Sequence, residues 1–413
     1  MTNTEMEDPH STNGNTNYNR CSSREKYADF LENSCCAQYC LGPNPSLARF
    51  CYALFFLATF LLAWTIRDYG QNVLSELKRL KGCQGAHYCL GAEGVLRISF
   101  GCFLFFFLMF LSTVGTKKLG DSRNYWHSEW WPAKIILWIG FMVLPFFIPS
   151  AFVQLYGKFA HFGAGAFLMI QLISVISFIT WINDCCRSEK YARKCRYQLL
   201  VLSVTTNVAS FVGIVLMYFW YVVDFSCRRN ILFITLTLVL LLLMILTSVN
   251  PKVNAGFLAP GLMGMYIVYL CWSAIRSEPL TYYCNKKAAI ATSEDWLTIV
   301  SFVIAVLAIV IATFSTGIDS KCLQFKNTEA ETEDGVLYGY GFFHFVFAMG
   351  AMYFGMLLVG WNAHKTMQKW TIDVGWASTW VRIVNEWVAT LVYMWLLVAP
   401  LVWKRMKQED HPV

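Results

Sequence analysis

Ten apolar segments, each about the length of a membrane-spanning helix, dominate this sequence. A helix of roughly 20 apolar residues crosses the ~30 Å hydrocarbon core of a bilayer. Backbone polar groups find no water in hydrocarbon, so only helices and closed barrels span it, and the alternating pattern of barrel strands is missing here. We therefore predict an all-α polytopic membrane protein with about ten transmembrane helices, at residues 47–66, 96–114, 133–149, 163–183, 198–222, 230–248, 257–275, 296–316, 342–361 and 381–402.

Composition agrees with this prediction. Of the 413 residues, 56% are hydrophobic and only 14% are charged, whereas a soluble domain has about 25% charged residues. Residues 1–45 are rich in Asn, Ser and Thr, which predicts a disordered, Cys-containing cytosolic tail. Residues 46–403 form the predicted transmembrane domain, and 404–413 form a short cytosolic C-terminal tail. Membrane lipids rather than nucleic acids are the predicted partners.

Lys and Arg residues are more frequent in the connections that lie on the side of the N-terminus, above all in the 184–196 loop. Because cytosolic loops carry such an excess, both termini are predicted to be cytosolic. The acidic 317–340 segment falls on the same side. It is either a solvated linker or the docking site of a cytosolic partner.

Cysteines divide between the two sides of the predicted membrane. Cys83, Cys89, Cys227 and Cys284 fall on the non-cytosolic side, where disulfides persist. Four cysteines allow two disulfides in any of three pairings, and one bridge or none is the alternative.

Three further cysteines, Cys35, Cys36 and Cys40, lie shortly before the first predicted helix. Cysteines close to a membrane can be palmitoylated, and free thiols are the alternative. A zinc site is disfavoured because these cysteines lack a matched second pair or a nearby histidine. No metal site is predicted.

Hydroxyl and amide side chains recur inside two predicted helices. In 198–222, Ser203, Asn207 and Ser210 are spaced by four and then three residues, so they share one helical face. In 163–183 the spacing is three throughout, and that stripe winds half round the helix; its members are Gln171, Ser174, Ser177 and Thr180. Such residues either bond to their own and neighbouring helices or line a polar groove in which a lipid headgroup is held or moved.

The segment 342–361 combines small residues with a histidine. Ala351 and Gly355 form a small-xxx-small pair, which predicts close packing against another helix. His344 lies near the cytosolic end, where it can hydrogen-bond either a neighbouring residue or a lipid headgroup. A proton relay would need ionisable groups deep in the membrane, and such groups are scarce. Glu386, in the last predicted helix and near its outer end, is the main candidate for that role.

Enzymatic motifs are lacking. The sequence has no HExxH, no G-x-S-x-G, no Walker loop and no Gly-rich nucleotide fingerprint. We therefore predict no enzyme, no catalytic residue and no cofactor, and any movement of substrate would proceed without ATP.

Several long motifs resemble the serine incorporator (Serinc) family, and they occur in family order over roughly residues 47–403. The two strongest are FFHFVFAMGAMYFGMLLVGW at 342–361 and DVGWASTWVRIVNEWVATLVYMWLLVAPLV at 373–402. Three more are YIVYLCWSAIRSEP at 266–279, FGAGAFLMIQ at 162–171 and GVLRISFGCFLFF at 94–106.

The resemblance implies a fold and a function. Serincs have ten helices in two subdomains joined by a long diagonal helix, which would be 163–183 here. Family members bind lipid in a groove between the subdomains, and some act as ATP-independent phospholipid scramblases. One residue departs from the family pattern. Ser177 stands where an Asp or Glu is usual, which puts headgroup-selective or ion-linked behaviour in doubt.

The predicted function is thus phospholipid binding and scrambling, with phosphatidylserine and phosphatidylethanolamine reaching both leaflets. Sphingolipids and sterol are alternative lipid partners, and a homo-oligomer is an open alternative. A scaffold that supports phosphatidylserine and sphingolipid synthesis is the second functional prediction, and a serine carrier the third. The plasma membrane and the endomembranes (endoplasmic reticulum, Golgi and endosome) are the predicted locations.

Overall fold

The fold was analysed in a computed structural model of the chain. It describes residues 45–70, 87–116, 118, 121–187, 189–222, 224–251, 253, 256–279, 281–282, 284, 296–318, 336, 338–361 and 371–409. These residues form eleven α-helices and one short 3-10 helix, with no strand among them. The predicted all-α class is confirmed.

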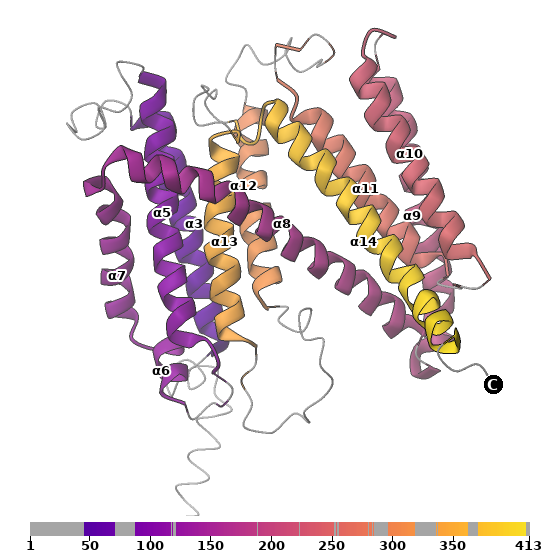
Figure 1. The fold of residues 1–413 in the computed structure, drawn as a ribbon, viewed down its shortest axis with the longest axis horizontal. Helices are drawn as coiled ribbons and strands as arrows, with labels where there is room; N and C mark the ends of the chain where they lie inside the picture. The colour runs from indigo at the N-terminus through magenta and orange to yellow at the C-terminus, as the bar shows by residue number, and fades with distance from the viewer. Residues whose placement is uncertain are drawn as a thin grey trace, which may run out of the picture.

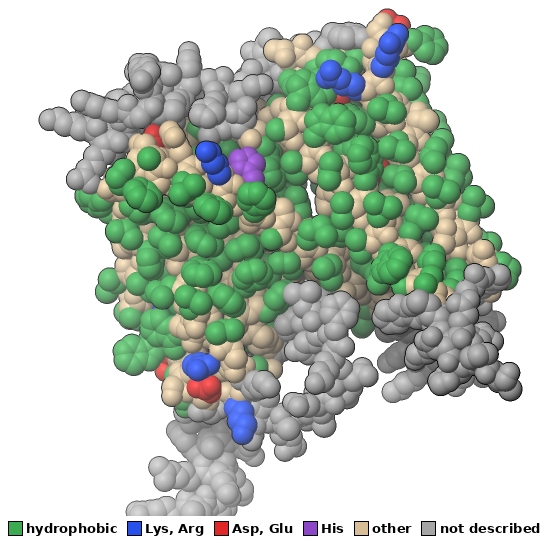
Figure 2. Space-filling view, viewed as in Figure 1, with side chains coloured by type: hydrophobic (Ala, Val, Ile, Leu, Met, Phe, Trp, Pro, Cys, Tyr) green, Lys and Arg blue, Asp and Glu red, His purple; other side chains and the backbone are tan. Residues whose placement is uncertain are grey.

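Eight helices are long and apolar enough to cross a membrane, and two further helices, bent by 68° relative to each other, together make a ninth candidate. The described part of a tenth, Phe302–Gly317, is apolar but shorter. All ten predicted segments lie on helices, with ends that differ by a few residues. Hydrophobic side chains cover the middle of the molecule, and charged side chains gather towards its two ends (Figure 2).

The helices form two bundles (Figure 1). The first bundle consists of α3 (Pro45–Tyr69), α5 (His87–Thr113), α6 (Ser122–Ser128), α7 (Trp131–Val143), the 3-10 helix η2 (Leu144–Phe147), α12 (Trp296–Ile318) and α13 (Tyr340–Leu358). The second bundle consists of α9 (Glu189–Tyr221), α10 (Arg228–Val249), α11 (Leu258–Arg276) and α14 (Trp376–Glu409).

The long helix α8 (Ser150–Arg187) crosses from the first bundle to the second (Figure 1). Near its start, Tyr156 and Ala160 belong to the apolar core of the first bundle. Further along, Leu172, Ile176 and Ile179 belong to the core of the second bundle. Because it is buried in both cores, α8 is the element that couples them. The two-bundle arrangement with a diagonal helix is the one that the family resemblance implies.

The first bundle has an unusually aromatic core. The rings of Phe56 and Phe354 lie 5.4 Å apart in an edge-to-face arrangement, and Phe106 and Phe347 lie 5.1 Å apart. All four side chains are fully buried. Aromatic pairs in such geometry are worth about 0.5–1.5 kcal/mol beyond their buried area. In a bilayer, where lipid tails compete as apolar partners, this packing supplies much of the helix association.

The small residues of α13 allow it to approach α5 closely. Ser99 Oγ on α5 donates a 2.9 Å hydrogen bond to the carbonyl oxygen of Ala351. A Cβ atom added at Gly355 would lie 2.6 Å from Ser99 Oγ and 2.9 Å from its Cβ. Gly355 therefore leaves the room that the α5–α13 contact needs.

Substituting Gly355→Ala should lower stability by about 1–3 kcal/mol, because the added methyl group forces the two helices apart. Gly140→Ala is the matched control, since nothing lies within 4 Å of a Cβ at Gly140 in α7. The measurement is the melting temperature of each purified variant in the same detergent. Equal melting temperatures for the two variants would show that the contact is looser than described.

Candidate lipid-binding site

The predicted polar stripe of α8 lies on a partly exposed side of the helix. Gln171, Ser174 and Ser177 are half-buried, and Thr180 is exposed. The Thr180 hydroxyl donates to the carbonyl oxygen of Ile176 at 2.9 Å, within its own helix. These polar side chains alternate with the buried Leu172, Ile176 and Ile179. The stripe therefore borders the face that α8 packs on the second bundle.

The predicted polar face of α9 has a different environment. Ser203 and Ser210 are buried, and Ser210 Oγ donates to the carbonyl oxygen of Thr206 at 2.8 Å. Asn207 Nδ2 donates to the carbonyl oxygens of Ser203 at 2.8 Å and of Phe257, next to α11, at 3.1 Å. This face is thus occupied by a neighbouring helix, which favours the helix-packing alternative.

Glycines on α11 make that packing close. A Cβ at Gly261 would lie 2.5 Å from both Asn207 Nδ2 and Thr206 Oγ1. A Cβ at Gly264 would lie 3.2 Å from Ser210 Oγ. The polar face of α9 is therefore fitted to a glycine face of α11, and lipid binding by Ser203, Asn207 and Ser210 stays a prediction.

A pocket of about 300 Å³ opens beside this contact, between α9 and α11. Its lining is almost entirely apolar and includes three large aromatic side chains. The lining residues are Ala209, Ser210, Gly213, Leu216, Met217, Trp220, Met265, Val268, Tyr269 and Trp272. Sequence reasoning identified only Ser210 among them, because an apolar lining has the same composition as any lipid-facing surface.

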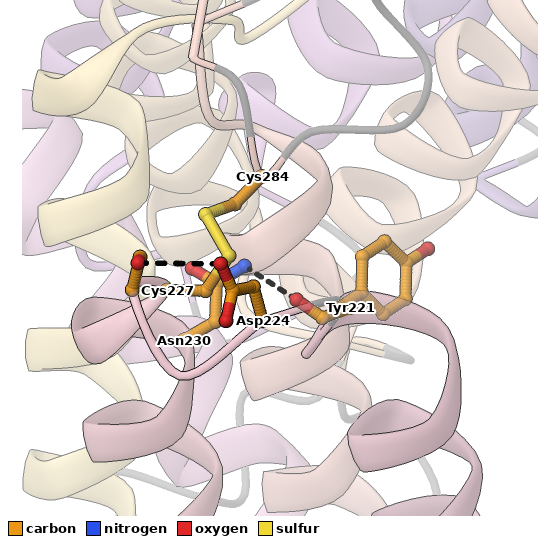
Figure 3. The surroundings of a disulfide bond; sticks show 6 residues. Tyr221, Asp224, Cys227, Asn230 and Cys284 are labelled. Atoms are coloured by element: carbon orange, nitrogen blue, oxygen red, sulfur yellow. Dashed lines mark hydrogen bonds between the residues drawn. A yellow bond between two sulfur atoms is a disulfide. The ribbon is translucent and has the colours of Figure 1, made fainter.

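One disulfide is described, and it joins Cys227 to Cys284 (Figure 3). Cys227 directly precedes α10, and Cys284 follows α11 by eight residues. Next to it, Asn230 Nδ2 donates to the carbonyl oxygen of Tyr221, the last residue of α9, at 3.1 Å. We call the end of the second bundle at which α9 and α11 end and α10 begins the disulfide end.

The other cysteine predictions stay predictions. Cys83 and the palmitoylation candidates Cys35, Cys36 and Cys40 lie outside the described residues. Of Cys89 only the backbone, in α5, is described. No group of three or more potential metal ligands occurs in the described ranges.

A buried polar cluster lies in the first bundle, where α6 and the starts of α7 and α13 meet. His127 Nδ1 and His344 Nε2 lie 3.0 Å apart, which bears out the prediction that His344 bonds a neighbour. The buried Lys134 Nζ donates to the carbonyl oxygen of His127 at 2.9 Å and lies 4.2 Å from the centre of the Trp131 ring. An ammonium group over an aromatic face gains cation–π energy. Sequence analysis did not identify this role of Lys134.

Two buried carboxyl groups lie in the second bundle. Thr237 Oγ1 on α10 lies 2.7 Å from Glu386 Oε1 on α14, so a hydrogen bond links the two helices. Glu278 is also fully buried, just beyond the end of α11 and outside the membrane span. Burial raises the pKa of Glu278 to about 7, although a hydrogen bond with Asn230 and the positive charge of Arg229 act in the opposite direction.

Comparisons of the sequence with known proteins identify the family to which the chain belongs. The family model described as "Serine incorporator (Serinc)" matches residues 28–335 and 320–406. The chain belongs to the serine incorporator family. A probable serine incorporator of Dictyostelium discoideum is 31% identical, over 76% of this chain and 81% of its own length. Serine incorporator 3 of Bos taurus is 27% identical over 89% of this chain and 93% of its own.

A third relative, a probable serine incorporator of Nematostella vectensis, is 26% identical over 89% of this chain and 92% of its own length. Membership of the family and the apolar helices together support a multi-pass membrane protein. The resemblance found in the sequence motifs is therefore confirmed.

Glu278 should make stability depend on pH. Its ordinary pKa is 4.5 and its folded pKa is about 7, so the folded state binds the proton more tightly. Stability should therefore fall as the pH rises between these two values, and above pH 7 the full penalty of the buried charge remains. Glu278→Gln should raise the melting temperature at about pH 8 by roughly 1–3 °C and remove the dependence.

Asp224→Asn is the matched control for this prediction, because Asp224 is an exposed carboxyl group at the same end of the second bundle. It should keep the pH dependence of the wild-type protein. The measurement is the melting temperature of each detergent-purified protein as a function of pH between the ordinary and the folded pKa of Glu278. If the melting temperature of Glu278→Gln depends on pH as steeply as that of the wild type, another group causes the dependence.

Proposed function

We propose that this protein binds glycerophospholipids along the partly exposed side of α8 and lets their headgroups cross between leaflets without ATP. The observation that carries this proposal is the polar stripe of α8, which stays accessible in a helix that crosses the membrane-spanning region between two bundles. The space-filling surface is also hollowed between the bundles (Figure 2).

The physical reason is the cost of a charged headgroup in hydrocarbon. Transferring an unpaired charged or polar group into an apolar medium costs several kcal/mol or more. Side chains such as Gln171 and Ser177 can replace part of the headgroup's hydration while the acyl tails remain in the bilayer. Polar residues in a membrane span are rare and mark such pathways. Phosphatidylserine and phosphatidylethanolamine are the expected lipids.

The role of α9 in this proposal is secondary. Thr206, Asn207 and Ser210 are packed against the glycines of α11 and so fix the position of α9, and Ser203 is buried on the same helix. This difference between the two helices provides matched variants. A substitution on α8 should change transport, and a similar one on α9 should change only packing.

The test is a leaflet-exchange assay with purified protein in liposomes that contain a fluorescent phospholipid. Dithionite bleaches only the outer leaflet, so bleaching well beyond one half reports scrambling. The double variant Gln171→Leu with Ser177→Ala should slow exchange by about tenfold, since losing a hydrogen-bonding group raises the barrier by about 1–2 kcal/mol.

Ser203→Ala on α9 is the control, and it should leave the exchange rate close to that of the wild type. Bleaching that stops at one half, with correctly inserted protein, would overturn the scrambling proposal. Equal rates in the α8 and α9 variants would show that the pathway lies elsewhere.

The names of the relatives favour a second candidate function, support of serine incorporation into lipids. In that case the chain would act as a scaffold for serine-using enzymes, and labelled serine would enter phosphatidylserine and sphingolipids faster in cells that express it. Uptake of labelled serine into vesicles that hold only the purified protein distinguishes the scaffold, which gives none, from a serine carrier.

A further inference from the structure

The pocket between α9 and α11 is a groove with a buried floor and exposed walls. Ser210, Met217 and Val268 form the floor and are nearly inaccessible. The walls include Trp220 and Tyr269, which are 50% and 54% exposed. In a membrane-spanning helix such exposed apolar walls face hydrocarbon rather than water. The chemistry of the surroundings therefore limits the occupant to a lipid.

The helices touch at the bottom of this groove because one residue has no side chain. A Cβ at Gly213 would lie 2.9 Å from Val268 Cγ1. The close contact brings the two backbones together, while larger side chains on either side keep the rims apart. The result is a groove that runs along the two helices.

The length of the groove matches one leaflet. Its residues run from Ala209 to Trp220 on α9, about 16 Å at 1.5 Å per residue. Half of the ~30 Å hydrocarbon core is about 15 Å. Trp220 and Trp272 lie at the last turns of α9 and α11, towards the disulfide end. Tryptophans favour the level of the lipid headgroups, so the groove extends from the headgroup region to about the middle of the membrane.

A positive charge stands at the mouth of the groove. The Arg276 guanidinium lies 4.7 Å from the centre of the Trp272 ring, one helical turn beyond it. Arg276 is half-buried, and no ion pair to it occurs within the described part of the chain. A guanidinium stacked on an aromatic ring that lines the groove suits a phosphate, which it can bind through two hydrogen bonds.

We propose that this groove holds one resident phospholipid of the leaflet at the disulfide end, with an acyl chain between α9 and α11 and its phosphate at Arg276. This lipid is separate from any lipid moved along α8, and a protein that scrambles nothing can still hold it. A sterol fits the site less well, because it carries no anionic group for Arg276.

The experiment uses the full chain reconstituted in vesicles with phosphatidylcholine that carries a photoactivatable diazirine in the middle of one acyl chain. After detergent extraction and washing, irradiation should label the peptides that contain Met217 and Met265. Because the washing removes bulk lipid, labelling there should exceed that of the lipid-facing side of α10. Scrambling is measured on the same vesicles, so failure of one proposal is distinguished from failure of the other.

Ala209→Trp should fill the inner end of the groove and reduce labelling by about tenfold. Val208→Trp is the matched control, since the neighbouring Val208 is exposed but does not line the groove, and it should label like the wild type. Arg276→Gln should weaken retention of the labelled phosphatidylcholine about tenfold, because it removes charge-assisted hydrogen bonds to the phosphate. Arg276→Lys should weaken retention less, because it keeps the positive charge.

Three results would overturn the proposal. The first is labelling of the groove peptides no stronger than that of α10, and the second is equal labelling of the Ala209→Trp and Val208→Trp proteins. The third is displacement of the labelled lipid by sterol but not by unlabelled phosphatidylcholine, together with an unchanged signal in Arg276→Gln. Size-exclusion profiles and melting temperatures confirm that each variant is folded before it is compared.

Discussion

A single buried arginine fixes the corner from which the diagonal helix departs. Arg97 is fully buried in α5, where it forms an ion pair with Glu93 at 2.7 Å. It also donates to the carbonyl oxygens of Pro145 and Ile148 and to Ser150 Oγ, at the break between η2 and α8. Prolines at such a break free backbone carbonyls, and hydrocarbon offers them no other donor. Arg97 therefore satisfies the carbonyl oxygens at this change of direction, and the course of α8 depends on it.

From this corner α8 runs through both apolar cores. This course explains why its polar side chains are partly exposed. A helix packed within one bundle would bury such side chains against neighbours, as α11 does with the hydroxyl face of α9. A helix that passes between two bundles has a side that neither bundle covers. Gln171, Ser174 and Ser177 lie half-exposed on α8 for this reason. The same polar residue types are thus buried against a neighbouring helix in α9 and partly exposed in α8.

Apolar length alone was enough to predict the helices, because the bilayer permits few alternatives. The motif Ala351-xxx-Gly355 also predicted a close contact, although not that Ser99 would be the partner. Tertiary partners could not be predicted from the sequence. The pairing of His127 with His344, or of Arg97 with the break at Pro145, joins residues that lie far apart in the chain. The groove between α9 and α11 was hidden for another reason, because its walls have the composition of any lipid-facing helix.

The disulfide also sets an order of events during synthesis. Cys227 and Cys284 are separated by 57 residues, and both α10 and α11 lie between them. Cys227 reaches its side of the membrane when α9 has been inserted, but its partner appears only after α10 and α11 have each crossed. Until then the first cysteine remains an unpaired thiol, open to exchange. Closure of the bridge therefore marks the moment at which the two crossings between the cysteines, α10 and α11, have both been completed. A chain in which only one of these two helices crosses leaves the two thiols on opposite sides of the membrane.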